Sequence, residues 1–261
     1  MKGILPLMSA LAVMFGSLAA VHAIANCPGT IMANYSTGDD IQVTSNTDCV
    51  TIGANSLTVN CNNHKILCNN AGGCNAGVNV PNGYSSTLVK NCWILNGTGD
   101  WYYGVLNGAT SGVASTTTVQ HVTTDNTTVS VYNPYSVNHS IFKDTTNCLL
   151  SNVSDKNGTI QENYCNASGD GIVIIGNDTQ VPTITKNYIR TPSTSLAVNV
   201  DNHGVDVEYN IFDGGSIDSV GGVTYSAFNI CDDLALNHCT EPAENTSTGQ
   251  PDFVMPLNFT P

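Results

Sequence analysis

The sequence predicts an all-β protein whose strands stack in successive coils, that is, a β-solenoid. One pattern occurs three times, at steps of 24 and 23 residues: IQENYC at 160–165, ITKNYI at 184–189 and VEYNIF at 207–212. β-Formers and Asn fill these copies, where a helical repeat would carry helix-formers. A fixed period in the twenties with this composition is typical of coils that each bury one face only by stacking on the next.

Each copy of the repeat predicts a bend in the chain. Apolar residues stand at offsets 0 and +5, an odd interval that a straight strand would place on opposite faces. Asn stands at offset +3, as Asn163, Asn187 and Asn210. Because Asn adopts the left-handed conformation more easily than other non-Gly residues, we expect these three to form the corner. Stacked corners would join their amides into a ladder.

Residues 1–25 have the features of a secretory signal peptide. Lys2 supplies a positive charge, residues 4–18 form a short apolar run, and residues 21–25 offer a small-residue cleavage site. Residues 26–56 lack a clear repeat, and we expect them to form an N-terminal cap that Cys27 and Cys49 could staple. A cap is needed because the first coil of a solenoid otherwise exposes an open strand edge.

Residues 57–230 are predicted to form about seven coils, in which segments with the corner pattern alternate with a second kind of strand. Val137 and Phe142 precede Ile160 and Cys165 by 23 residues each, so the strict register extends back one coil, with Ser140 in the Asn ladder. Unequal loops are expected between residues 67 and 136, where the spacing drifts. The Pro-rich residues 231–261 are expected to form a C-terminal cap and tail.

These repeats resemble the right-handed parallel β-helix repeats of the pectin-lyase-like superfamily, with the NosD-type carbohydrate-binding and sugar-hydrolase repeats the most similar. The three copies carry the resemblance, together with GDGIVIIG at 169–176 and LAVNVD at 196–201. Residues 57–66 (LTVNCNNHKI) are similar to the opening coil of such proteins. The resemblance implies a right-handed parallel β-helix, but it does not imply one activity, because such repeats occur in enzymes, binding proteins and structural proteins.

The charge of the chain limits its partners. Seven Lys and Arg face 20 Asp and Glu, a net charge of −13. Such an acidic chain is a poor binder of nucleic acids and of anionic membranes. After cleavage of the signal peptide, no remaining stretch is apolar enough to insert into a membrane. We therefore expect a secreted protein, extracellular or periplasmic, whose partner is a polysaccharide or another glycan.

The cysteine content agrees with export. All ten Cys follow the signal peptide, and an even number in an exported chain predicts disulfides. Cys68 with Cys74, and Cys231 with Cys239, would close short loops, whereas the repeat register directs Cys165 into the core. Ten Asn-x-Ser/Thr sequences permit N-glycosylation.

Three Asp residues stand at similar places before the repeats. Asp178 and Asp201 each stand six residues before a repeat, and Asp155 stands five before, so we expect them to form a column. Because stacked carboxylates repel one another, such a column favours solvated turn residues, a Ca²⁺ site, or a catalytic acid and nucleophile pair with His203 nearby. No complete polygalacturonase or pectate lyase motif is present, and Arg190 is the only Arg.

Aromatic residues form the other candidate site. Trp101, Tyr102 and Tyr103 lie in a Gly-flanked segment that should leave Trp101 and at least one of the two tyrosines exposed beside a groove, and Tyr132 and Tyr135 lie in a later turn. Exposed rings of this kind can stack on sugar rings. We expect glycan binding without cleavage. A polysaccharide lyase or glycoside hydrolase that uses the Asp column is one alternative, and a structural or adhesive surface protein is another.

Overall fold

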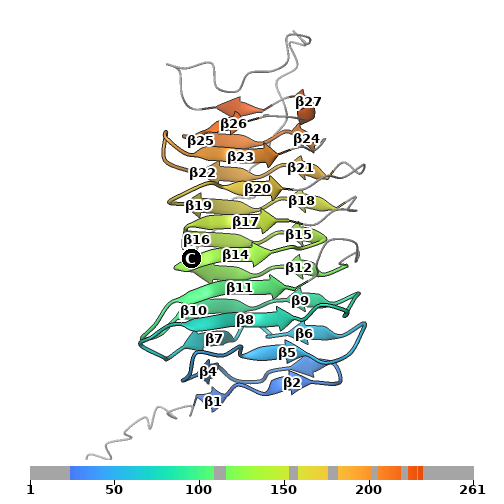
Figure 1. Cartoon of the computed structure of the whole chain (residues 1–261), viewed down its shortest axis with the longest axis vertical. Coiled ribbons are helices and arrows are strands. Elements are labelled where there is room, and N and C mark those ends of the chain that lie inside the picture. Colours follow the sequence, from blue (N-terminus) through green and yellow to red (C-terminus); the bar gives the residue numbers. More distant parts are fainter. Residues whose placement is uncertain are drawn as a thin grey trace, which may run out of the picture.

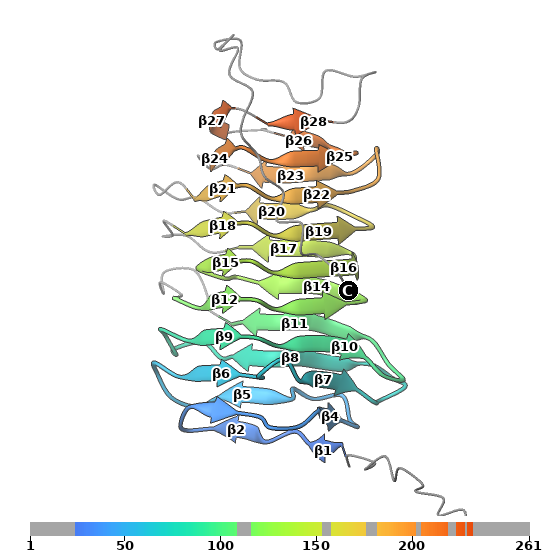
Figure 2. The same cartoon turned by 180° about the vertical axis from the view of Figure 1, so that it is seen from behind.

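The fold is a parallel β-solenoid. The computed structural model describes residues 24–108, 116–152, 158–175, 182–201, 205–218, 223–227 and 229–231, and the regular elements in these ranges are all strands. These strands stack along one long axis and form three parallel sheets that run side by side along it (Figures 1 and 2). The repeat region makes about seven turns, as predicted. The described ranges contain no helix that could cross a membrane.

Each sheet receives one strand from each coil, and we name the sheets A, B and C. In the described residues, sheet A contains, in spatial order, β1 (Ala25–Asn26), β4 (Ile41–Val43), β7 (Lys65–Cys68), β10 (Trp93–Asn96), β13 (Thr123–Asp125), β16 (Ile141–Thr145), β19 (Tyr164–Ala167), β22 (Tyr188–Arg190), β25 (Ile211–Asp213) and β28 (Ile230–Cys231). Sheet B contains β2 (Gly29–Ile31), β5 (Val50–Ile52), β8 (Cys74–Val80), β11 (Trp101–Asn107), β14 (Thr127–Tyr132), β17 (Asn147–Ser151), β20 (Ile172–Ile175), β23 (Leu196–Asp201) and β26 (Ser216–Asp218). Sheet C contains β3 (Tyr35–Ser36), β6 (Thr58–Asn60), β9 (Leu88–Lys90), β12 (Thr118–Gln120), β15 (Ser136–Asn138), β18 (Thr159–Gln161), β21 (Thr183–Thr185), β24 (Val205–Glu208) and β27 (Val223–Ala227).

The solenoid begins before the first recognisable repeat. Strands β1 to β5 lie between residues 25 and 52, in the segment expected to be a cap, and they pair in parallel with the strands of the following coils. These early coils differ from the later ones in length, so their residues do not recur at a constant step. Residues 1–23 of the expected signal peptide lie outside the described residues, as does nearly all of the expected C-terminal cap and tail.

The predicted register is confirmed. Ile160, Ile184 and Val207 are direct neighbours on β18, β21 and β24. The row extends along sheet C toward the N-terminal coils. Its further members are the buried valines 137, 119, 89 and 59. A fully buried aliphatic side chain contributes about 1.5–3 kcal/mol through the hydrophobic effect, so this row and its counterparts in sheets A and B supply the core.

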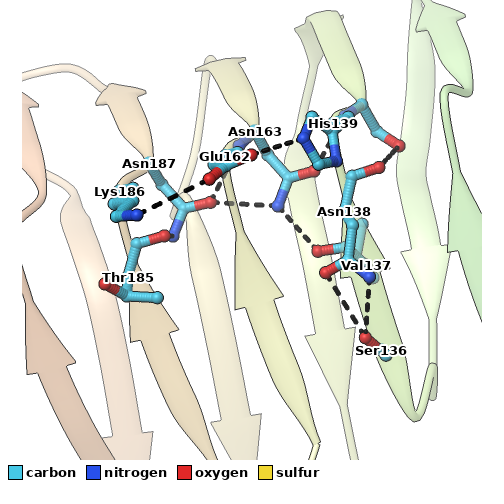
Figure 3. Close-up of polar contacts among 10 residues, drawn as sticks. Ser136, Val137, Asn138, His139, Glu162, Asn163, Thr185, Lys186 and Asn187 are labelled. Atoms are coloured by element: carbon cyan, nitrogen blue, oxygen red, sulfur yellow. Dashed lines mark hydrogen bonds and ion pairs between the residues drawn. The ribbon is translucent and has the colours of Figure 1, made fainter. Parts of the chain in front are cut away.

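The predicted Asn ladder is present and buried. The Nδ2 of Asn163 donates to Oδ1 of Asn187 at 2.9 Å, and the Nδ2 of Asn187 donates to Oδ1 of Asn210 at 3.0 Å. Figure 3 shows Asn163 and Asn187 pointing toward each other from neighbouring coils. Asn229 extends the ladder by one coil, because its Oδ1 accepts from Asn210 at 3.0 Å. Ser140 occupies the ladder position of an earlier coil, as expected, and its backbone N–H donates to Oδ1 of Asn163 at 2.9 Å.

The prediction that Asn itself takes the left-handed conformation was wrong. The left-handed residue is the one before each ladder Asn: Glu162, Lys186 and Tyr209 have φ angles of 55°, 55° and 54°. The Asn side chains turn inward, where they bond the carbonyl oxygens of the neighbouring coil, as Asn187 does with Ile160 at 2.9 Å. Asn is therefore required at this position for its inward hydrogen bonds. The residue before it, which is more exposed, makes the sharp turn.

Four disulfides staple the described part of the solenoid. The pairs are Cys27–Cys49, Cys61–Cys92, Cys68–Cys74 and Cys148–Cys165. The first and third were anticipated from the sequence, and Cys165 lies in the core as its register required. Cys239 lies outside the described residues, so the Cys231–Cys239 pair stays a prediction. Four disulfides indicate that the protein folds in an oxidising environment.

Candidate functional site

A cluster of three tyrosines lies on β11 and β14 of sheet B. The ring centroids of Tyr102 and Tyr103 are 4.6 Å apart, and those of Tyr103 and Tyr132 are 5.3 Å apart. Both pairs meet edge to face, the geometry that the ring quadrupoles favour. The sequence placed Tyr103 and Tyr132 in separate candidate groups, and the stacking of β14 on β11 brings them together.

Within this cluster, Tyr102 is the ring that is open to solvent. Its side chain is 53% exposed, whereas Tyr103 and Tyr132 are half-buried. Burial, together with the neighbouring phenols of Tyr102 and Tyr132, raises the pKa of Tyr103 above its ordinary value. The Tyr103 ring packs against Tyr102 and Tyr132 and supports the exposed ring of Tyr102.

Trp101 contradicts the expectation that it would be exposed. Its side chain is fully buried, and its Nε1 donates to the carbonyl oxygen of Leu95 at 2.9 Å. The flanking Gly99 had suggested a loosely packed segment. It is needed instead because two loops approach each other closely at this position. A Cβ on Gly99 would lie 1.8 Å from the carbonyl oxygen of Asn70. Trp101 is thus part of the solenoid core, and it anchors β11 next to the exposed ring of Tyr102.

An open cleft of about 420 Å³ adjoins Tyr102. The turns that link β7 to β8 and β10 to β11 form most of it, and these turns project from one side of the solenoid (Figure 1). The polar side chains that line it are Asn46, Thr98, Asp100 and Thr128. The residues that line it include one carboxylate and no Lys or Arg. Asp100 is held in place because its Oδ1 accepts from Nδ2 of Asn96 at 2.6 Å.

Tyr135, the remaining aromatic candidate, is separate from the tyrosine cluster. It is 36% exposed and lies in the turn between β14 and β15. Its backbone N–H donates to the carbonyl oxygen of Thr117 at 2.8 Å, and its ring makes none of the contacts that join the three clustered tyrosines. Tyr135 therefore provides a natural comparison for Tyr102.

The Asp column falls almost entirely outside the described residues. This holds for Asp155, Asp178 and His203, whereas Asp201 ends β23, where its backbone pairs with Ile175. The catalytic and Ca²⁺ roles of this column therefore stay predictions. Within the described ranges, no group of three or more His, Cys, Asp or Glu side chains is arranged to hold a metal ion.

The structure also shows two charged groups that sequence reasoning missed. On sheet A, burial and the nearby carboxylate of Asp144 raise the pKa of Asp125, while Lys143 lowers it. At the outer corner, Glu162 contacts His139 and lies 3.7 Å from Nζ of Lys186 (Figure 3). Both groups arise because successive coils align residues that are 18 to 24 positions apart in the sequence. His139, Glu162 and Lys186 each stand one residue before a ladder position, so the ladder register could have predicted that they are neighbours. Surface pairs of this kind contribute about 0–1 kcal/mol each.

Comparisons with known proteins add no family to these observations. No family model, no curated protein and no solved structure matches the chain.

Proposed function

We propose that this protein is an exported β-helix of the pectin-lyase-like type that binds a glycan at the Tyr102 cleft without cleaving it. The observation that carries the proposal is the exposed ring of Tyr102 beside an open, polar cleft on a rigid scaffold. The signal-peptide features and the disulfides support export. The repeat pattern and the parallel sheets support the superfamily assignment.

The chemistry of the cleft suits a sugar. An exposed tyrosine offers a flat apolar face to the C–H groups of a pyranose ring and a hydroxyl at its edge. Asp100 and Asn46 supply acceptors and a donor for sugar hydroxyls, and Thr98 and Thr128 add hydroxyls of their own. Binding sites of this type combine a stacking surface with a few polar groups that fix orientation.

The charge of the site favours neutral or cationic glycans. Asp100 is the one charged residue that lines the cleft, and the whole chain carries a net charge of −13. A uronate polymer would bring further negative charge to this surface, and the cleft offers no Lys or Arg to pair with it. Polygalacturonate is therefore expected to bind more weakly than a neutral polysaccharide.

The composition of the same cleft supports the proposal of binding without cleavage. Glycoside hydrolysis ordinarily requires two carboxyl groups on either side of the scissile bond, about 5–10 Å apart. Asp100 is the only carboxylate that lines the cleft. The hydrolase and lyase alternatives depend on Asp178, Asp201 and His203, whose side chains lie outside the described part of the chain.

A polysaccharide array combined with a product assay tests the proposal. The labelled protein is applied to neutral, amino and uronate polysaccharides, and each glycan that binds is then incubated with the protein and sized. We expect binding to at least one neutral or amino glycan, whose length stays unchanged. Shortening of the bound glycan would show that the protein is an enzyme, and the absence of binding across the whole array would remove the glycan-binding proposal.

A further inference from the structure

Two histidines stack on the outer corner that links sheet C to sheet A. His121 follows β12 and His139 follows β15, so the two residues occupy the same place in neighbouring coils. Their ring centroids are 5.1 Å apart, and the ring planes differ by 29°. Both residues are exposed, and the side chain of His139 is 47% exposed. The pair is therefore open to an ion from solvent.

The backbone fixes the spacing of this pair. Both histidines have the left-handed conformation, with a φ angle of 51°. Each directly precedes a residue that the corner ladder holds. The N–H of Val122 donates to Oγ of Ser140 at 3.2 Å, and the N–H of Ser140 donates to Oδ1 of Asn163 at 2.9 Å. Only the exposed side chains of the two histidines are left free to turn.

The separation of the rings matches that of two imidazoles bound to one zinc ion. With Zn–N bonds of about 2.0–2.1 Å and a tetrahedral angle of about 109°, the centres of two coordinated rings lie about 5 Å apart. The observed separation of His121 and His139 is 5.1 Å. Rotation about their own side-chain bonds therefore suffices to aim one nitrogen of each ring at a shared ion, and the backbone need not move.

Glu162, one coil further along, lies where a metal-binding histidine usually has a carboxylate partner. Its Oε2 contacts Nε2 of His139, and Figure 3 shows the two side chains pointing toward each other. Because a carboxylate accepts a hydrogen bond, this contact places the ring proton on Nε2. The lone pair of Nδ1 is then available to a metal ion, and the carboxylate increases the basicity of that nitrogen.

We propose that His121 and His139 bind one divalent transition-metal ion of the zinc type, with Glu162 orienting His139. Imidazole nitrogen suits such ions, whereas Mg²⁺ and Ca²⁺ prefer oxygen ligands. The part of the chain that the structure describes holds no group of three or more His, Cys, Asp or Glu arranged for a metal ion, so water completes the coordination. The site does not depend on the Tyr102 cleft, which lies on sheet B and the turns from sheet A.

Isothermal titration of the full chain with Zn²⁺ tests this proposal. His121→Asn and His139→Asn should each abolish Zn²⁺ binding at the pair. Asn is the matched replacement because Asn91 occupies the same corner position one coil earlier, with a φ angle of 52°. His64→Asn, which removes a histidine beside Asp40 at an earlier corner, should bind Zn²⁺ like the wild type. Unchanged Zn²⁺ binding in either corner variant, or an equal loss in His64→Asn, would overturn the proposal.

A second pair of variants tests the orienting role of Glu162. Glu162→Ala should weaken Zn²⁺ binding about tenfold, since the loss of a carboxylate that orients a metal-binding histidine costs about 10–100-fold. Glu208→Ala removes the same charge two coils further along and should change the affinity less than about twofold. An equal effect of the two changes would contradict the orienting role.

Nuclear magnetic resonance of the wild type gives a readout that does not rely on the folding of any variant. Zn²⁺ should shift the imaginable reporters of ligation, the imidazole ¹⁵N signals of His121 and His139, and leave that of His64 in place. Mg²⁺ at the same concentration should shift none of the three. Signals of His121 and His139 that do not move with Zn²⁺ would refute the site.

Discussion

Removal of one ladder amide should destabilise the solenoid strongly. Asn187 is 1% exposed; its Nδ2 donates to the carbonyl oxygen of Ile160 at 2.9 Å, and its Oδ1 accepts the backbone N–H of Asn163 at 3.1 Å. Asn187→Ala leaves both buried groups without these partners. Since each unpaired buried group costs about 1–3 kcal/mol, we expect the free energy of unfolding to fall by about 2–6 kcal/mol.

Urea denaturation followed by circular dichroism measures this change. The matched control is Asn166→Ala, because the half-buried Asn166 side chain bonds Asp144 on the surface at 3.1 Å. That control should change the free energy of unfolding by no more than about 0.5 kcal/mol. Asn187→Ser should fall between the two, since Ser140 shows that a hydroxyl can accept one backbone N–H in the ladder, from Val122 at 3.2 Å. If Asn187→Ala and Asn166→Ala lose equal stability, the ladder does not hold the coils together as argued.

Three further predictions concern ionisation, the cleft loops and calcium. Burial and the hydrogen bond to Asp213 raise the pKa of Tyr188 from 10.0 to about 12; the stability this provides is present below pH 10 and is lost as the pH rises through 12. In an ultraviolet titration, the wild type should therefore show one tyrosine that ionises near pH 12, and this step should be missing in Tyr188→Phe. Gly99→Ala should destabilise the protein by about 1–3 kcal/mol because of its clash with the neighbouring loop. Gly72→Ala, whose Cβ would meet no atom closer than 3.7 Å, should melt like the wild type. If the Asp column binds Ca²⁺, a hundredfold excess over Kd should add about 2.7 kcal/mol of stability, and Asp201→Asn should abolish the gain. A wild-type melting temperature that does not respond to Ca²⁺ would contradict that site.

The sequence predicted the fold where the coils have equal length. Ile160, Ile184 and Val207 recur at steps of 24 and 23 residues, and their pairing follows directly from that near-constant spacing. The spacing is less regular in the earlier coils, which were also predicted, because their corners differ in length. Val59 and Val89 are paired, yet Ile66 and Ile94, which are also paired, follow them by seven and five residues.

The candidate site was only partly predictable from the sequence. The aromatic residues were identified, but the direction of each ring depends on contacts between coils that no local pattern reveals. Trp101 turns inward because the carbonyl of Leu95, on the preceding strand, accepts its indole N–H. Tyr103 and Tyr132 meet across a coil boundary, 29 residues apart in the sequence.

The affinity of the Tyr102→Ala variant for a glycan selected on the array tests the central claim most directly. Isothermal titration calorimetry compares the wild type with Tyr102→Ala and with Tyr135→Ala, in which an exposed tyrosine outside the cluster is removed. Because an exposed aromatic anchor at a binding site contributes about 2 kcal/mol, Tyr102→Ala should weaken binding by about 30-fold. Tyr135→Ala should bind like the wild type. Unchanged affinity in Tyr102→Ala, or an equal loss in both variants, would contradict the assignment of the cleft as the glycan site.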